Sequence, residues 1–199
     1  MKIPIDVAKS IQLINTGKPL KIDALILNGQ PFFMTAGIGY DAKVIEQFNK
    51  LPFRGVNAYL TGILTTVFSY KLPTFTIEID NEKTIETEAF TVLATSTGQL
   101  GYNVEFTKNS VLNDGKFEVC IVRDFNKTRL PNLIYESFFG DIASQDIIET
   151  HRVNKILKVR ANNIESIQMD GDYKGKTNYI EVTGQKQAIN FLVDKDYEI

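Results

Sequence analysis

The sequence predicts a mainly β (α+β) protein, an antiparallel β-sandwich with a few helices packed at its edges. From Pro73 onward, apolar and polar residues alternate over short runs that end in turn residues, as in half-buried strands. These runs give about nine strands against three or four helices, and most strands follow one another directly, which favours a sandwich over a doubly wound sheet. No repeat or linker divides the chain, so we expect one domain, residues 1–199.

The N-terminal third predicts a short helix, a hairpin and two more helices. Asp6 can cap the first helix and Gly17 can end it. Asn28-Gly29 is a strong hairpin signal, and it joins two expected strands with the sequences LKIDALIL and FFMTAG. The expected hairpin therefore runs from Leu20 to Ala36. Two helices follow, with the sequences GIGYDAKVIEQFN and RGVNAYLTGILTTVFSY.

The second of these helices carries an apolar stripe at helical spacing. We expect the stripe to pack on the core, and the alternative is a surface for lipid or a partner. Its members are Val56, Tyr59, Leu60, Ile63, Leu64, Val67 and Phe68.

The rest of the chain predicts strands and one helix. The first strand alternates Phe75, Ile77 and Ile79 with polar residues, DNEK forms a turn, and the next strand contains Phe90 and Val92. The later strands are expected at FEVCIV, HRVNKILKVRA, IESIQM, NYIEVTG and QAINFLV, and the helix at RLPNLIYESFF.

Composition excludes several functional classes. A net charge of −2, without a run of like charges, gives no basis for nucleic-acid binding. Cys120 is the only cysteine and lies in an apolar run, so we expect its thiol to be buried and inert. With one cysteine no intrachain disulfide can form, which fits a cytosolic protein. His151 is the only histidine, which leaves no metal-ligand set of His and Cys and no Ser-His-Asp triad. The N-terminus has no signal-peptide core, and no segment has the roughly 20 apolar residues of a membrane span.

Two loops combine an acid with glycine: VLNDGKFEV at residues 111–119 and MDGDYKG at residues 169–175. Each taken alone is most simply a hairpin turn, so a purely structural role for both is one hypothesis. Together they could supply oxygen ligands for a hard cation and a separate carboxylate that accepts a proton.

Four motifs resemble a known family. FFMTAGIGYDAKV, RGVNAYLTGIL, NSVLNDGKFEVCIV and IQMDGDYKG occur in the order and approximate spacing of the C-terminal half of the bacterial diacylglycerol kinase and sphingosine kinase superfamily. The resemblance covers nearly the whole chain, and its specificity lies in the ordered set of four. It implies the β-sandwich domain of a lipid kinase.

That family also has an N-terminal domain whose GGDGT and GTGNDFA-like motifs hold ATP. Neither motif occurs in this sequence, and residues 1–27 resemble the helix and strand that follow them. The resemblance therefore implies the C-terminal part of an ATP- and Mg-dependent enzyme that transfers the γ-phosphate to the hydroxyl of diacylglycerol or a related lipid alcohol. We expect the isolated chain to be inactive, because it lacks the glycine-rich cradle for the phosphates.

The resemblance also implies site residues. A structural Mg²⁺ would be bound by the Asp114 side chain and by the backbone carbonyls of Val111 and Lys116. The family motif DGE matches DGD here, which places Asp172 as the acceptor of the lipid hydroxyl proton and Asp170 beside it. Aspartate is one methylene shorter than glutamate, and about 1 Å of misplacement can cost on the order of a hundredfold in rate. The alternative hypothesis is therefore a non-catalytic binding module that kept the fold.

The expected cofactors and partners follow from the same resemblance. They are Mg²⁺, ATP as co-substrate, a diacylglycerol-like lipid and the protein's own N-terminal nucleotide-binding domain. The implied location is cytoplasmic, with peripheral contact at the inner membrane surface. The sequence does not name the lipid, and it leaves open whether the protein is a homodimer.

Overall fold

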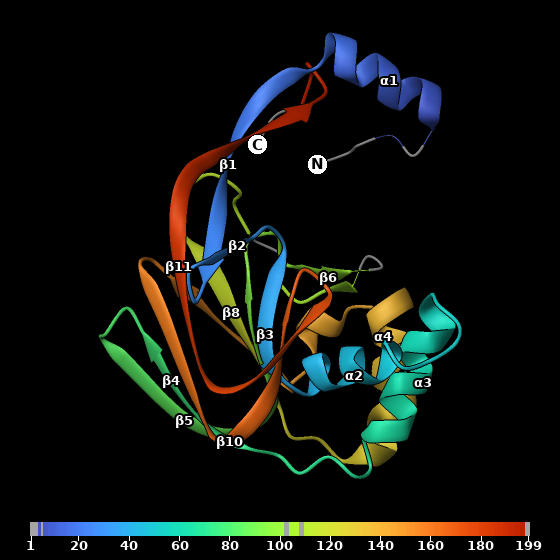
Figure 1. The fold of residues 1–199 in the computed structure, drawn as a ribbon, viewed down its shortest axis with the longest axis vertical. Coiled ribbons are helices and arrows are strands. Elements are labelled where there is room, and N and C mark those ends of the chain that lie inside the picture. The colour runs from blue at the N-terminus through green and yellow to red at the C-terminus, as the bar shows by residue number, and fades with distance from the viewer. Residues whose placement is uncertain (1–3, 5, 102–103, 108–109, 198–199) are drawn as a thin grey trace.

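The computed structural model describes residue 4 and residues 6–101, 104–107 and 110–197. It confirms a mainly β fold made of antiparallel strands, with the later helices gathered to one side and the first helix apart from them (Figure 1). The helices are α1 (Val7–Thr16), α2 (Tyr40–Phe48), α3 (Val56–Thr66) and α4 (Leu130–Phe139), with the 3₁₀ turns η1 (Lys127–Arg129) and η2 (Ile142–Ser144). No helix in the described ranges has the length and apolar character needed to cross a bilayer.

Nine of the strands form one sheet in the order β2-β1-β11-β10-β3-β5-β8-β9, with β4 also paired to β10 and β5, and β6 and β7 form a separate ribbon. The strands are β1 (Lys18–Leu27), β2 (Gln30–Phe32), β3 (Thr35–Gly39), β4 (Thr74–Ile79), β5 (Lys83–Thr95), β6 (Gln99–Gly101), β7 (Val104–Glu105), β8 (Phe117–Arg123), β9 (Ile148–Val153), β10 (Ile156–Met169) and β11 (Asp172–Val193).

The long strands β5 and β10 hold two shorter strands end to end between them. Residues 157–161 of β10 pair with β4, and residues 167–169 pair with β3. Strand β5 divides in the same way, with residues 83–88 on β4 and 91–95 on β3. The sheet folds over itself, because Leu25 and Leu27 of β1 share one buried cluster with Phe117 and Val119 of β8, although β1 and β8 are not paired. This cluster is the core of the sandwich.

Strand β1 and the end of β11 form a two-stranded arm that carries α1 away from the body of the molecule (Figure 1). The predicted caps of α1 are confirmed: the Asp6 side chain accepts the N–H of Lys9, and Gly17 ends the helix. Leu13 is the buried side chain of this helix, whereas its apolar residues Val7, Ile11 and Ile14 are exposed. Helix α1 therefore presents an uncovered apolar face.

Helix α3 packs through small residues as well as through part of the predicted stripe, since Ile63 and Val67 belong to a buried apolar cluster with Phe90. Its buried residues are the small ones, Ala58, Gly62 and Thr66, and a Cβ on Gly62 would lie 3.1 Å from the Val44 carbonyl oxygen of α2. The predicted stripe is only partly covered, and its members Leu64 and Phe68 are exposed. The expectation that the whole stripe packs on the core is wrong, because close approach of two helices selects small residues at the contact.

Several strand boundaries also differ from the prediction. The expected strand FFMTAG is divided between β2 and β3 at residues 33 and 34. HRVNKILKVRA contains a turn at residues 154 and 155, where the Asp80 carboxylate accepts three backbone N–H groups. The long strands β10 and β11 contain three segments that were expected as separate strands: IESIQM, NYIEVTG and QAINFLV. Pairing with distant strands continues through the polar residues between these segments, where the local sequence pattern predicts that a strand ends.

Candidate functional site

A pocket of about 370 Å³ lies between α2, α3, α4 and the turn that joins β10 to β11. One side of its lining is polar and the other is apolar. Its lining residues are Met34, Thr35, Asp41, Ile45, Phe48, Tyr59, Val104, Phe138, Gln168, Asp170 and Gly171. The pocket thus joins one of the two predicted acids to a hydrophobic interior.

Asp170 and Gly171 form the tight turn at the pocket mouth, and both have positive φ values, 48° and 82°. The Asp170 carboxylate accepts the backbone N–H groups of Phe33, Met34 and Thr35 at 2.9, 2.7 and 3.2 Å. Its own N–H donates to the Thr35 carbonyl oxygen at 2.7 Å. These bonds fix the chain where β2 passes into β3, so Asp170 builds the rim of the pocket.

Asp172 begins β11 and points into solvent. Its side chain is 77% exposed, and its ion-pair partner is the exposed Lys174, with a 3.4 Å separation between Nζ and Oδ2. Asp172 does not belong to the pocket lining, although it follows Gly171, which does. Of the two predicted acids, Asp170 is therefore held by backbone donors and Asp172 is accessible.

Asp41, in the first turn of α2, is an acid in the pocket that the sequence analysis did not select. The side chain is buried and lies against Thr91 of β5 and Gln168 of β10. Gln168 is completely buried, and its Nε2 donates to Asp41 Oδ2 at 3.0 Å while its Oε1 accepts the Gly171 N–H at 3.1 Å. Gln168 therefore links the buried acid to the rim turn.

Burial and hydrogen bonds act on the pKa of Asp41 in opposite directions, and burial has the larger effect. Burial raises the pKa of this carboxyl group, against hydrogen bonds from Thr91 and Gln168 that lower it. The Thr91 hydroxyl also lies 3.0 Å from the Ile38 carbonyl oxygen, and a hydroxyl has one proton to donate. Thr91 is the donor in both contacts, so its proton is shared between Asp41 Oδ1 and the Ile38 carbonyl oxygen.

The predicted magnesium loop lies apart from this pocket. The Asp114 carboxylate forms an ion pair with Arg152 of β9 and accepts the Lys116 N–H at 2.9 Å. The buried Asp23 anchors the loop, because its carboxylate accepts the N–H groups of Gly115 and Gln187, both at 2.6 Å. Sequence reasoning missed Asp23, whose signal would have been an acid in the middle of an apolar strand.

With Arg152 on Asp114, the side chains as they lie do not fit a bound Mg²⁺. Within the described ranges, no group of three or more His, Cys, Asp or Glu side chains could hold a metal ion. The Mg²⁺ ligands Val111, Asp114 and Lys116 stay a prediction.

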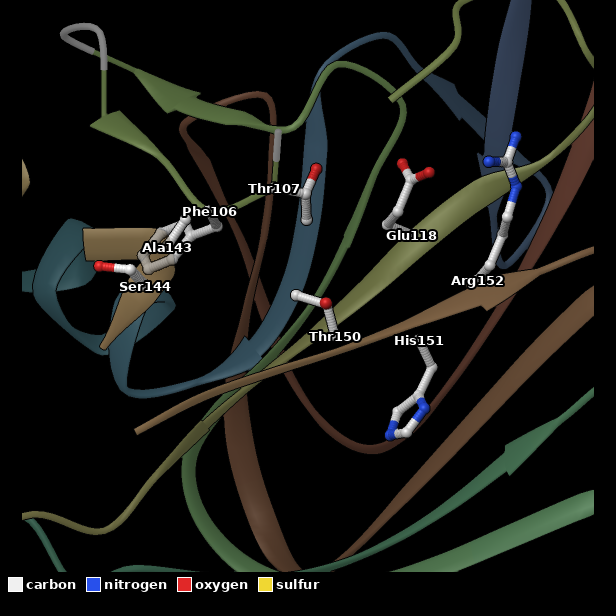
Figure 2. A pocket seen from close by; sticks show the side chains of 8 residues that line it. All are labelled: Phe106, Thr107, Glu118, Ala143, Ser144, Thr150, His151 and Arg152. Carbon is white, nitrogen blue, oxygen red and sulfur yellow. The ribbon is translucent and has the colours of Figure 1, made fainter. Parts of the chain in front are cut away.

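A second, polar pocket of about 380 Å³ lies beside this loop and contains the side chains of Glu118 and Arg152 (Figure 2). Glu118 is buried, burial raises its pKa, and the Ser110 hydroxyl donates to it at 2.7 Å. His151 points away from Glu118 in Figure 2 and contacts Glu149, with 2.6 Å between Nε2 and Oε1. His151 thus belongs to a surface hydrogen-bonded group with Glu149, which also pairs with Arg123.

Comparison with known proteins identifies the family of this chain. Residues 34–191 match the family model described as the YegS C-terminal NAD kinase beta sandwich-like domain. The chain is 27% identical over 176 residues to a diacylglycerol kinase of Bacillus subtilis, covering 85% of this chain and 56% of that protein. It is 23% identical over 197 residues to an uncharacterised Synechocystis protein, covering 96% of this chain and 45% of that one.

A crystal structure of a diacylglycerol kinase from Bacillus anthracis has the same fold, with a TM-score of 0.64 at 16% identity, over 97% of this chain and 61% of that one. The chain spans about half the length of the curated relatives it matches. The protein belongs to the family of the YegS C-terminal NAD kinase beta sandwich-like domain.

Proposed function

We propose that this chain is the lipid-binding part of an ATP- and Mg-dependent kinase that phosphorylates diacylglycerol or a related lipid alcohol. The observation that carries the proposal is the pocket of about 370 Å³, in which an apolar interior of Ile45, Phe48 and Phe138 meets a polar mouth at Asp170 and Gly171. Such a pocket suits an amphipathic ligand whose hydrocarbon is buried while its polar head stays at the opening.

In the proposed reaction, the lipid hydroxyl oxygen attacks the γ-phosphorus of ATP. The bond from the γ-phosphorus to the bridging oxygen breaks, ADP leaves, and the hydroxyl proton passes to the carboxylate of Asp172. Asp172 suits this role because its side chain is exposed and close in sequence to the pocket rim, whereas the Asp170 carboxylate is occupied by three backbone donors. Asp170 would be a positioning residue.

ATP would come from an upstream nucleotide-binding domain of the same protein. The exposed apolar face of α1 supports that part of the proposal, because a covering domain would bury Val7, Ile11 and Ile14. The isolated chain would then bind lipid without transferring phosphate.

Exposed apolar side chains on neighbouring helices support contact with a membrane, from which such a lipid would be taken. They are Leu64 on α3, Phe68 in the turn that follows α3, and Tyr135 and Phe139 on α4. The two helices share a cluster through Ile63 and Ile134. We expect the double variant Phe68→Ser with Phe139→Ser to lose sedimentation with phosphatidylglycerol vesicles. Unchanged sedimentation would exclude this face.

The proposed function is tested with the protein that carries both domains, incubated with labelled ATP, Mg²⁺ and dioctanoylglycerol in micelles. We expect labelled lipid phosphate, and we expect Asp172→Asn to lower the rate by at least about a hundredfold. Absence of transfer to any lipid alcohol, with ATP shown to be bound, contradicts the proposal.

The alternative is a binding module without catalysis. The shorter acid at position 172 and the occupied Asp114 favour it. The variant Asp172→Glu separates the two functions, because a longer acid should raise the activity of a weak kinase but cannot restore chemistry to a module that has lost it.

A further inference from the structure

Gln168 of β10 is a polar side chain that is completely buried and contacts the turn between β10 and β11. Burying an amide costs free energy unless its hydrogen-bonding groups find partners. Its Nε2 donates to Asp41 Oδ2 at 3.0 Å and to Thr35 Oγ1 at 3.4 Å. Its Oε1 accepts the Gly171 N–H at 3.1 Å. The two ends of the amide therefore contact two different parts of the candidate site.

The turn depends on this amide for an acceptor outside the strand ladder. Met169 and Asp172 form the last pair of the ladder between β10 and β11, so the two residues between them lie outside it. The N–H of the second one, Gly171, donates to Gln168 instead. Because Asp172 follows Gly171 directly, Gln168 fixes the backbone one residue before the proposed proton acceptor.

Asp41 decides which way the Gln168 amide points. A glutamine side chain has an oxygen that accepts and an NH₂ group that donates, and a half-turn of the amide exchanges the two. Asp41 accepts at Oδ2, so the NH₂ group faces Asp41 and the oxygen is left for Gly171. The Thr91 hydroxyl holds Asp41 in turn, because it donates to Oδ1. Three hydrogen bonds thus run in series from β5, through the buried acid and the buried amide, to the turn.

We propose that Gln168 is a positioning residue for phosphoryl transfer, which holds Asp172 where its carboxylate can accept the proton of the lipid hydroxyl. The inference rests on the proposed function, since Asp172 has this role only in that reaction. The Asp172 side chain is 77% exposed, so its place depends on the backbone of the turn rather than on packing. A displacement of about 1 Å can cost on the order of a hundredfold in rate. Loss of the Gln168 contact should therefore lower kcat more than it weakens substrate binding.

The first test assays variants of the protein that carries both domains, with Mg-ATP and dioctanoylglycerol in micelles. Gln168→Met keeps the length of the side chain and removes the hydrogen bonds of the amide. We expect kcat to fall by about tenfold to a hundredfold while the KM for ATP changes by less than about twofold.

Ser166→Ala is the matched control. Ser166 lies two residues earlier on β10, is also buried, and donates a side-chain hydrogen bond to Glu46 that does not reach the turn. Because this variant loses a buried hydrogen bond on the same strand without touching Gly171, its kcat should stay within about twofold of the wild-type value.

Exchanging the acid and the amide separates positioning from packing. Gln168→Glu alone keeps an acceptor for the Gly171 N–H but sets a second acid against Asp41, so kcat should fall. In the double variant Asp41→Asn with Gln168→Glu, the amide at position 41 can accept from Thr91 and donate to the acid at position 168. The other oxygen of that acid accepts the Gly171 N–H. We expect the double variant to recover most of the kcat lost in Gln168→Glu, whereas independent packing effects would add.

The Gly171 N–H gives a readout that does not need activity. In the isotope-labelled chain, its hydrogen exchange should become at least about tenfold faster in Gln168→Met, because the amide proton loses its acceptor. In the exchanged double variant, the wild-type rate should return.

The outcomes distinguish this inference from the proposed function. An active kinase whose kcat is unchanged in Gln168→Met, or whose losses add in the double variant, overturns the inference and leaves the proposed function intact. Unchanged exchange at Gly171 in Gln168→Met overturns the inference whatever the activity. No phosphate transfer by the wild type, with ATP shown to be bound, contradicts the proposed function, and this inference with it.

Discussion

At the scale of single residues, the three acids near the candidate pocket differ in what holds them. Asp170 accepts three backbone N–H groups, Asp172 is exposed beside Lys174, and Asp41 is buried against Thr91 and Gln168. The sequence pattern drew attention to the first two because an acid beside glycine is visible in a local motif. Asp41 was missed because its partners come from β5 and β10, and only the fold brings them together.

Replacing Asp170 should destabilise the fold more than replacing Asp172. Asp170→Ala removes the acceptor of three backbone N–H groups, and because water can partly replace it, we expect a loss of about 1–2 kcal/mol in the free energy of unfolding. Asp172→Ala, the matched control, should change it by less than about 0.5 kcal/mol. Urea denaturation checks both, and equal effects would contradict the roles assigned to the two acids.

Asp41 should make stability depend on pH in a defined direction. Burial places its folded-state pKa above the unfolded value of 3.8, so the neutral acid stabilises the fold at low pH, and this contribution is lost as the pH rises through the folded-state pKa. Asp41→Asn stays neutral at every pH. The stability of the variant relative to the wild type should therefore increase as the pH rises above 3.8 towards the folded-state pKa, as measured by urea denaturation at successive pH values. A constant difference would mean that Asp41 is ionised throughout.

Arg152 should compete with a cation for Asp114. Arg152→Met removes the guanidinium group, and if the loop binds Mg²⁺, affinity measured by calorimetry should rise by up to about fivefold. Lys174→Met is a control with the same change in charge. Magnesium affinity that does not respond to Asp114→Asn would refute the predicted ligand.

At the scale of elements, turns and helix ends were predictable and strand lengths were not. The Asn28-Gly29 hairpin, the capped helix α1 and helix α4 lie where local chemistry indicates. The division between β2 and β3 depends on Asp170, which is 135 residues from Thr35 in sequence. For helix α3 the apolar stripe predicted part of the packing, at Ile63 and Val67, but it did not predict the small residues that the contact with α2 requires.

The contact between α2 and α3 should tolerate no large side chain at Gly62. Gly62→Leu would push against the carbonyl oxygen and Cγ1 of Val44, which lie 3.1 and 3.2 Å from the position of a Cβ. We expect a loss of about 2–3 kcal/mol in the free energy of unfolding. Leu64→Ala, on the exposed side of the same helix, should cost about 0.5 kcal/mol or less. Similar thermal melts for the two variants would contradict the assigned face.

At the scale of the whole molecule, the ordered set of motifs predicted the family and the sandwich, and both are confirmed. The order of strands in the sheet could not be predicted from the sequence. Strands β3 and β4 lie end to end between β5 and β10, and these pairings join segments that are far apart in the chain. The pocket could not be predicted from the sequence either, because its lining residues are spread along the chain from Met34 to Gly171.

The central claim is that this chain holds a lipid alcohol between α2, α3, α4 and the Asp170 turn. Photoaffinity labelling with a diacylglycerol that carries a diazirine in its acyl chain tests it most directly. Mass spectrometry should find the label on peptides containing Tyr59 and Phe138, and excess unlabelled dioctanoylglycerol should abolish it. Label confined to the exposed residues of α1, or insensitive to the competitor, would contradict the account.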